Sequence, residues 1–539
     1  MSYLKTRQYG EERRHEFTAA YANQIAGTLS GFDRLVVRGT LRRIAYPFGL
    51  KGYLWANQVL LKDFGSHAQQ VSEIVKAGSL EAITAAGRPV HYLHSSRTDK
   101  EQMARQIAVA DRIAEGPVCA LTCVEPCWGF DIHRNRQTKQ LDLVQRSRKC
   151  LFVYQYWQDP EFGWMNARIQ TWFPFSIQVC LNGREWLARQ MSKQGIRYRK
   201  HDNCFVWVED WPRAQQLLDQ QLRTNWEEAL KRVARLLNPG HQEVFARFPM
   251  EYYWSSYQTE WATDVTFHRP EDLRRLFPLW LRHAVVTFQC SDILKFLGKR
   301  LTAQGEVPDR VPIEVTTSLK RRQPGARIKH RYGSNSVKVY DKAYDTVGST
   351  LRAEMTMQDP EQFRVYRRPE GKPDQPQRWY RLRHGVADLY RRAEICQKVN
   401  ERYLNALAQV DTDATLQELL TATQRPVMWQ GKRHRALRPF AEPDVILLEA
   451  ISRGDFLIQG LRNRDLQQVL YAHSPKDQAE RRRRSAAVSR KLRLLRAHGL
   501  IGKISGTHRY QVTDRGRKLL PAIMAARQAT LNHLNAQAA

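Results

Sequence analysis

The chain has 539 residues, and its 86 lysines and arginines against 54 aspartates and glutamates give a formal net charge of +32. An apolar share of 42% excludes a disordered chain, and the sequence contains no apolar run long enough to predict a membrane span. The first residues lack the apolar core of a secretory signal peptide, so we expect a cytoplasmic protein with no membrane partner. The charge predicts a polyanionic partner, because basic side chains displace the counterions condensed on a phosphate backbone.

Residues 1–238 are predicted to form a mixed α/β domain with an antiparallel meander. The segments "KCLFVYQYWQ", "MNARIQTWF" and "FSIQVCLNG" are strand-like and follow one another directly. Cys119, Cys123 and Cys127 alternate with strand-like residues, which favours reduced, buried thiols over a zinc site. This part of the chain therefore predicts a sheet and no cysteine-bound metal.

The middle of the chain is divided by changes in periodicity and composition. We expect a mostly helical, aromatic-rich insertion over residues 239–310, a strand pair over 311–360, a helical segment over 361–425 and a basic linker over 426–442. A two-stranded hairpin with one apolar face is only marginally stable alone. We therefore expect the strand pair to complete the sheet of the N-terminal domain.

The strand pair contains the segment "SVKVYDKAYDTVGSTLRAEMTM", residues 336–357. Alternation places an apolar set on one face, which comprises Val337, Val339, Leu351, Ala353, Met355 and Met357. The other face is polar and comprises Ser336, Lys338, Tyr340, Lys342, Arg352, Glu354 and Thr356. In the register that we expect, Tyr340 lies directly opposite Glu354.

The polar face has residue types that suit phosphodiester cleavage. Tyr340 can attack a phosphate if Lys338 and Lys342 stabilise its anion. Arg352 can clamp phosphate oxygens, and Glu354 can hold Mg²⁺ or Mn²⁺. A solvated, salt-bridged hairpin and a noncatalytic phosphate-binding hairpin are the alternatives.

The longer stretch "RIKHRYGSNSVKVYDKAYDTVGSTLRAEMTM" resembles a region of rolling-circle replication initiators of the filamentous-phage and plasmid types. That resemblance implies an endonuclease domain built on an antiparallel sheet, with a metal ion and a tyrosine nucleophile. Tyr340 falls on the "YDK" motif, and Arg352 and Glu354 fall on the "R-x-E" motif. Tyr332 and Tyr344 are alternative nucleophiles.

The chain departs from those initiators because it has no His-x-His metal motif. Two acidic segments can supply the missing ligands. One is "TEWATDVTF", which contains Glu260 and Asp264, and the other is "GFDIH", where Asp131 and His133 share a strand face. Ordinary polar roles for these residues remain the alternative.

Residues 443–525 contain three helical patterns, two short strands separated by Ser505 and Gly506, and a final helix that starts at Thr513. This order, and "SRKLRLLRAHGLIGKISGTHRYQVTDRGRKLL" in particular, resembles winged-helix regulators of the MarR type. The resemblance implies a recognition helix and a wing that contact nucleic acid. The expected contact residues are Arg481, Arg482, Arg483, Arg484, Arg490, Lys491, Arg493, Lys503, His508 and Arg509.

Taken together, the sequence predicts an α+β protein: an antiparallel-sheet N-terminal and central domain with helical insertions, followed by a C-terminal winged helix. The function that accounts for size, charge and strand pair together is a DNA-processing nicking enzyme of the replication-initiator or transposition type, docked by the winged helix. The alternative is a noncatalytic DNA-binding regulator or a protein that binds structured RNA, with aromatic strands stacking on bases. The sequence favours DNA, leaves catalysis open and does not specify an oligomeric state.

Overall fold

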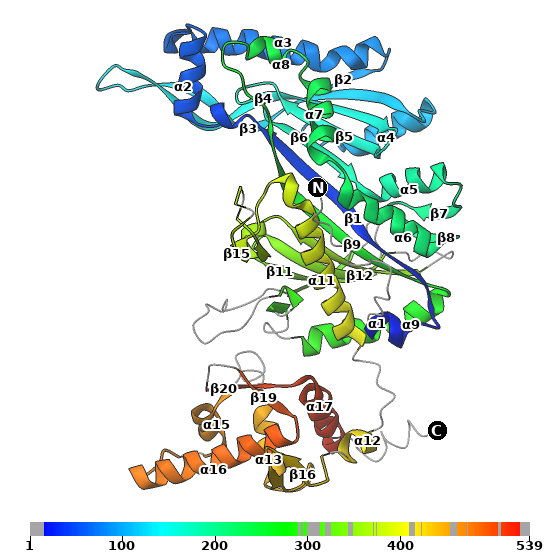
Figure 1. Cartoon of the computed structure of the whole chain (residues 1–539), viewed down its shortest axis with the longest axis vertical. Coiled ribbons are helices and arrows are strands. Elements are labelled where there is room, and N and C mark those ends of the chain that lie inside the picture. The colour runs from blue at the N-terminus through cyan, green and yellow to red at the C-terminus, as the bar shows by residue number, and fades with distance from the viewer. Residues whose placement is uncertain are drawn as a thin grey trace. The chain divides into compact units, whose positions relative to one another are not determined.

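The computed structural model describes residues 16–288, 293–294, 296–298, 313–318, 325–342, 349–369, 371–372, 374–408, 416–421, 423–452, 461–471, 473–504 and 508–528. The chain divides into two compact units. One unit comprises Tyr21–Phe277 and Glu314–Glu401, and the other comprises Met1–Ala20, Pro278–Ile313 and Arg402–Ala539. The expected α+β class with a large, mainly antiparallel sheet is confirmed (Figure 1).

The first unit is built on an eleven-stranded sheet in the order β10-β11-β12-β13-β9-β1-β6-β5-β4-β3-β2. Its strands are β1 (Ile25–Thr40), β2 (Val90–Leu93), β3 (Gly116–Arg134), β4 (Leu141–Asp159), β5 (Gly163–Gln170), β6 (Ile177–Asn182), β9 (Tyr253–Phe267), β10 (Ile313–Ser318), β11 (Gly325–Tyr332), β12 (Asn335–Asp341) and β13 (Ser349–Met357). The long strands β1 and β9 pair at its centre and connect the strand pair β12–β13 to the N-terminal meander.

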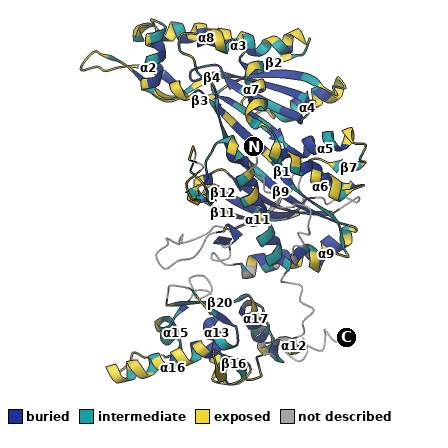
Figure 2. Ribbon diagram, viewed as in Figure 1, coloured by how far each residue is buried: buried dark blue, intermediate teal, exposed yellow. Residues whose placement is uncertain are grey.

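Helices cover both faces of this sheet. Those of the first unit are α2 (Pro47–Ala56), α3 (Phe64–Ala85), α4 (Lys100–Ala110), α5 (Gly183–Lys193), α6 (Trp211–Asp219), α7 (Trp226–Leu237) and α8 (His241–Val244), together with most of α11 (Leu389–Ala408). On one face, Asn400 of α11 donates hydrogen bonds to the carbonyls of Trp261 in β9 and Ala353 in β13. On the other face lies the hairpin of β7 (Tyr198–His201) and β8 (Cys204–Val208). The backbone carbonyl of Asn203, in the turn of this hairpin, accepts a hydrogen bond from Arg352 of β13. The central strands are therefore buried on both sides (Figure 2).

Three expected segments differ from the structure. Residues 239–310 were expected to be mostly helical, but β9 takes up 253–267 between α8 and α9 (Pro270–Thr287), because its tyrosine, tryptophan and threonine side chains favour a pleated, buried strand. The helical segment 361–425 begins with a two-stranded ribbon, β14 (Arg364–Arg367) and β15 (Arg378–Arg381), before α11. The linker 426–442 contains the hairpin β16 (Val427–Trp429) and β17 (Lys432–His434), and Arg496 lies over the ring of Trp429.

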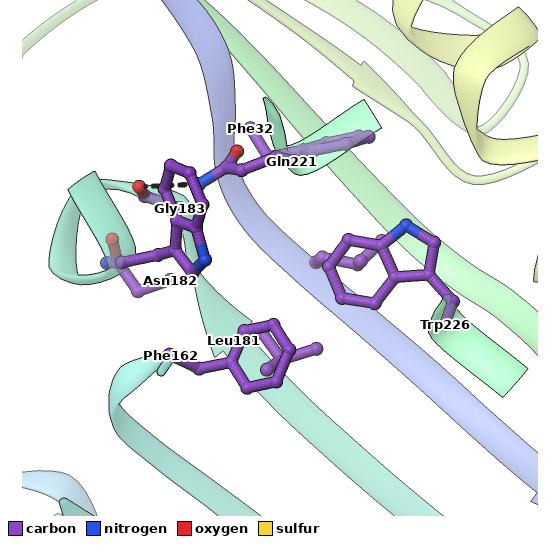
Figure 3. Close-up of a pocket in the computed structure, with 9 residues that line it drawn as sticks. Phe32, Phe162, Leu181, Asn182, Gly183, Gln221 and Trp226 are labelled. Atoms are coloured by element: carbon purple, nitrogen blue, oxygen red, sulfur yellow. Dashed lines mark hydrogen bonds between the residues drawn. The ribbon is translucent and has the colours of Figure 1, made fainter. Parts of the chain in front are cut away.

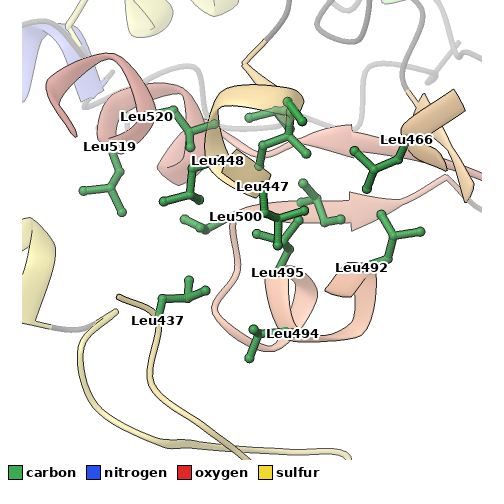
Figure 4. Packing of buried hydrophobic residues seen from close by; sticks show 14 of the residues in the cluster. Leu437, Leu447, Leu448, Leu466, Leu492, Leu494, Leu495, Leu500, Leu519 and Leu520 are labelled. Carbon is green, nitrogen blue, oxygen red and sulfur yellow. The ribbon is translucent and has the colours of Figure 1, made fainter. Parts of the chain in front are cut away.

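The C-terminal part of the second unit has its own leucine-rich core (Figure 4). Its elements are α12 (Leu416–Thr421), α13 (Asp444–Ile451), β18 (Leu461–Arg462), α15 (Asn463–Leu470), α16 (Gln478–Ala497), β19 (Ile501–Lys503), β20 (Arg509–Val512) and α17 (Asp514–Gln528). The three strands form a sheet in the order β18-β20-β19, and the expected turn at Ser505 and Gly506 lies outside the described residues. α1 (Glu16–Ala20) also belongs to this unit.

Among the described residues, no helix has both the length and the apolar character that a membrane crossing requires.

Candidate functional site

The polar face of the strand pair lies on β12 and β13, beside the central strand β9, and the register of the pair differs by two residues from the expected one. Tyr340 lies opposite Arg352, and Lys338 lies opposite Glu354. Side chains alternate with a period of two, so a shift of two residues keeps every side chain on its expected face. The apolar face is buried as expected, with Val337, Val339 and Leu351 at most 2% exposed.

Arg352 is the centre of a buried ion network. Its side chain has no exposed surface; Nε donates to Asp264 Oδ1 at 2.6 Å, and Nη1 lies 3.1 Å from Asp33 Oδ2. Arg184 of α5 lies 3.0 Å from Asp264 on its other side. Burial alone would raise the pKa of Asp264, but the two guanidinium groups hold it below its ordinary value. Arg352 and Asp264 thus neutralise each other inside the fold.

Glu354 binds the two neighbouring residues of β12. Lys338 Nζ donates to Glu354 Oε1 at 2.7 Å, and the Tyr340 hydroxyl donates to Glu354 Oε2 at 2.9 Å. Burial, reinforced by the charge of Glu354, raises the pKa of Tyr340 well above its ordinary value. Burial also acts against the ionised form of Glu354, but the charges of Lys338 and Arg352 keep the pKa of that carboxyl below its ordinary value. The pair is therefore a neutral phenol bound to a carboxylate.

Lys342, the other expected partner of the tyrosine anion, points elsewhere. It is 6% exposed, and its Nζ lies 3.4 Å from Asp202 Oδ2 in the turn between β7 and β8. The two lysines therefore have different carboxylate partners.

The carboxylate of Glu354 also lies close to two other carboxylates. Asp33, Glu260 and Glu354 have oxygens within 4.8 Å of one another. Asp33 lies where the register of β1 shifts between Phe32 and Arg34, so a bulge directs its side chain toward the site. Burial and the nearby Glu354 raise the pKa of Glu260 to about 7.

Clustered carboxylate oxygens are ligands that Mg²⁺ and Mn²⁺ prefer, so the group can hold a cation in chemical terms. Its oxygens already have protein partners, because Asn203 Nδ2 donates to both oxygens of Asp33 and Gln258 donates to Glu260. Sequence reasoning missed Asp33, although an aspartate inside the apolar strand "GFDRLVV" signals a buried charge that needs a partner.

The structure does not bring Asp131 and His133 to this site. They lie on β3, which is six strands away from β13, on the order of 30 Å at the usual strand spacing. Asp131 instead pairs with Arg146 of β4 at 2.5 Å. Of the alternative tyrosines, Tyr332 ends β11, and Tyr344 lies outside the described residues.

A second candidate surface is the exposed side of α16. Its exposed arginines are Arg481, Arg482, Arg483, Arg490 and Arg493. Lys491 is half-buried. Arg484 is also half-buried and is engaged within the module: it lies 2.7 Å from Glu480, donates to the carbonyl of His473 and stacks over the ring of Tyr471. The arginines predicted from sequence as one group therefore fall into two classes.

The two short strands next to α16 also present basic side chains. Lys503 of β19 and His508 are exposed. Arg509 of β20 is half-buried, and it pairs with Arg462 of β18 in the sheet register.

A small pocket elsewhere in the sheet domain has mainly aromatic and apolar walls (Figure 3). Phe162 and Trp226 stack with ring centroids 5.8 Å apart, and Gln221 donates to the carbonyl of Gly183. Its walls contain no titratable side chain, which makes it a poor candidate for catalysis.

No family model, curated protein or solved structure matches the chain. A function for this protein is therefore argued from the geometry of its residues.

Proposed function

We propose that the chain is a nucleic-acid-binding protein that binds duplex DNA through α16. The observation that carries this proposal is a row of exposed arginines, Arg482, Arg483, Arg490 and Arg493, which lie within about 100° of one another around the axis of that helix. Arg482 and Arg493 are eleven residues apart, which places them on the same helix face and about 16 Å from each other. Neither makes an ion pair with any described residue, so both remain available for phosphate oxygens.

The surrounding elements support the same proposal. The order α13-β18-α15-α16-β19-β20-α17 of the described elements, with the strands arranged β18-β20-β19, supports the proposal of a winged-helix module. In such a module the third helix faces the DNA groove, and α16 is the third helix that the structure describes from residue 443 onward. Leu492 and Leu495 are buried on its inner face, so the helix holds its arginines on a fixed frame. Lys503 and His508 then occupy the positions of a wing.

The test is the salt dependence of duplex binding by the full chain. Replacing Arg482 and Arg493 by alanine should lower the affinity and flatten the slope of log K against log salt by about 0.9 for each lost phosphate contact. Arg484→Ala is the matched control, because it removes an arginine of the same helix that is already paired with Glu480. An unchanged slope in the double variant, or an equal loss in the control, would refute the assignment of this face.

Strand cleavage at the cluster of Asp33, Glu260 and Glu354 is the second candidate. The observation that favours it is the convergence of three carboxylates beside Lys338 and Tyr340. A bound Mg²⁺ or Mn²⁺ would supply Lewis-acid chemistry to a phosphate there. Tyr340 would attack phosphorus through Oη and pass its proton to Glu354, while the bond from phosphorus to the sugar oxygen breaks and the leaving oxygen takes up a proton from water.

The burial of the groups that would cleave DNA argues against cleavage, which is why cleavage is the second candidate. Tyr340 is 5% exposed, and Arg352, expected to clamp the phosphate, is fully buried between two aspartates. A DNA strand would reach Arg352 only after the hairpin β7–β8, which contacts that arginine through Asn203, moved. Binding through α16 requires no such movement.

Labelled single-stranded DNA incubated with the protein and Mg²⁺ or Mn²⁺ tests cleavage directly. The proposal expects a covalent adduct that Tyr340→Phe abolishes and that Glu354→Gln strongly reduces. An adduct that survives Tyr340→Phe would move the nucleophile to Tyr332 or Tyr344. If no adduct and no cut strand form while duplex binding persists, the noncatalytic function stands alone.

A further inference from the structure

The two-stranded ribbon β14–β15 has an unusual composition for an exposed hairpin. Tyr366 and Trp379 lie directly opposite each other, 57% and 62% exposed, with ring centroids 5.4 Å apart. Arginines lie opposite arginines on either side of this pair, Arg364 with Arg381 and Arg367 with Arg378. No other strand pairing among the described residues places arginine opposite arginine on both sides of an exposed aromatic pair.

This pairing is unfavourable for the ribbon itself. Like charges directly opposite each other destabilise a strand pair, and two-stranded ribbons are marginal even without such repulsion. Protein carboxylates offset little of it, because the pair between Arg381 and Glu361 is 3.4 Å long and joins two exposed side chains. Arg364 and Arg378 make no ion pair with any described residue. An anion from outside the chain would remove the repulsion.

The ribbon is nevertheless held firmly at its base. Phe363 and Leu382, which flank the two strands, are buried, and the amide of Leu382 donates to the carbonyl of Phe363. Arg383 pairs with Asp388, and the amide of Ser256 in β9 donates to the carbonyl of His384. The exposed end therefore projects from a fixed attachment to the main sheet domain (β15 in Figure 1).

Alternation separates the two faces of the ribbon. Val365 is buried, so Arg364 and Tyr366 lie on the opposite, outer face, and the register places Trp379 and Arg381 on that same face. Each aromatic ring is two residues, about 7 Å, from an arginine on the same strand. The outer face thus combines two rings for stacking with two cations for phosphates.

We propose that the outer face of the β14–β15 ribbon binds single-stranded nucleic acid. Unpaired bases stack on Tyr366 and Trp379, and their phosphates bind Arg364 and Arg381. A duplex fits this surface less well, because its bases are already stacked on each other and present no free faces. This inference shares with the proposed function only the choice of nucleic acid as the ligand. It assigns single strands to the ribbon, whereas the proposed function assigns duplex DNA to α16.

Fluorescence anisotropy of labelled oligo-dT and oligo-U with the full chain tests this proposal, with a labelled duplex in a parallel series. Trp379→Ala should weaken binding of the single strands about tenfold, as expected for the loss of one stacked base, and Trp379→Phe should restore most of it. Arg364→Ala combined with Arg381→Ala should flatten the salt slope of single-strand binding by roughly 0.7 per lost phosphate contact. Oligo-dT and oligo-U together determine whether the ribbon distinguishes DNA from RNA.

Two matched controls separate this proposal from the duplex-binding one. Trp55→Ala removes a tryptophan of α2 that is 84% exposed, and should leave single-strand binding unchanged. Arg482→Ala with Arg493→Ala should weaken duplex binding and spare the effect of Trp379→Ala on single strands. Single-strand binding that is unaffected by all ribbon variants, or that falls equally with Trp55→Ala, would overturn the proposal whether or not α16 binds duplex DNA.

Discussion

Arg352 and the exposed arginines of α16 show two opposite uses of the same side chain. Arg352 is fully buried between Asp33 and Asp264, so its charge stabilises the chain's own carboxylates. Arg482 and Arg493 lie in solvent with no carboxylate partner among the described residues. A net charge of +32 therefore does not measure the binding surface, because only the unpaired class is available to a polyanion.

The largest effect is expected from Arg352→Leu, which breaks the buried network. The free energy of unfolding should fall by about 3–5 kcal/mol, because two buried aspartates lose their main cation. Urea unfolding measures it, and Arg490→Ala should change stability by no more than about 0.5 kcal/mol as an exposed control. Adding Asp33→Asn should recover part of the loss, because Asp264 keeps Arg184 as its partner. Equal effects at Arg352 and Arg490 would break the comparison.

The second prediction concerns the pH dependence that Glu260 gives to stability. Its folded-state pKa, about 7, exceeds the ordinary 4.5, so the folded protein binds more protons than the unfolded chain between these values. Stability should therefore fall as the pH rises from 4.5 to 7, by roughly 2 kcal/mol from this group. Glu260→Gln should remove that part of the pH profile in urea titrations.

Divalent cations provide a further readout at Glu260. If the cluster binds Mg²⁺ or Mn²⁺, the cation should stabilise the wild type more at pH 8 than at pH 5, and Glu260→Gln should reduce this gain. If the cation changes the melting temperature of the wild type and of Glu260→Gln equally, the cluster is not a cation site.

Much of the sheet follows from local patterns, while the burial of its polar face does not. Alternation correctly identified Val337, Val339 and Met355 as core residues and kept Tyr340 and Glu354 on one face. The exact pairing partner was wrong, because a connection of uncertain length leaves the register of a hairpin open by two residues.

The cover over that face comes from distant parts of the chain. Asn203 contacts Arg352 across 149 positions of sequence, and Asp33 approaches from β1 through a bulge. The alternation of polar and apolar residues along a strand contains no information about contacts with distant segments. A buried ion network and a solvent-exposed active site therefore have the same sequence pattern. The ribbon β14–β15 was missed for a related reason: its strands are only four residues long and flank a segment rich in proline and glycine.

Tyr340→Phe sharpens the comparison by removing one hydroxyl from the buried network. The free energy of unfolding should fall by about 1.5 kcal/mol, because the buried carboxylate of Glu354 loses a donor at 2.9 Å. Tyr366→Phe is the matched control, since the same hydroxyl is removed from a side chain that is 57% exposed, and it should have almost no effect. Similar losses at both tyrosines would mean that Tyr340 is not the buried donor described above.

The smallest expected effect has the opposite sign and concerns the ribbon. In the absence of nucleic acid, Arg364→Gln should raise the free energy of unfolding by about 0.2–1 kcal/mol, because it removes the repulsion from Arg381 across the strand pair. Arg381→Gln should give less, because that arginine also has Glu361 at 3.4 Å. Local protection of the β14–β15 amides in hydrogen exchange is the sensitive measurement, since the ribbon opens before the sheet unfolds. Lower protection in Arg364→Gln would mean that this arginine stabilises the ribbon. The arginine–arginine repulsion that a bound phosphate is proposed to relieve would then not exist.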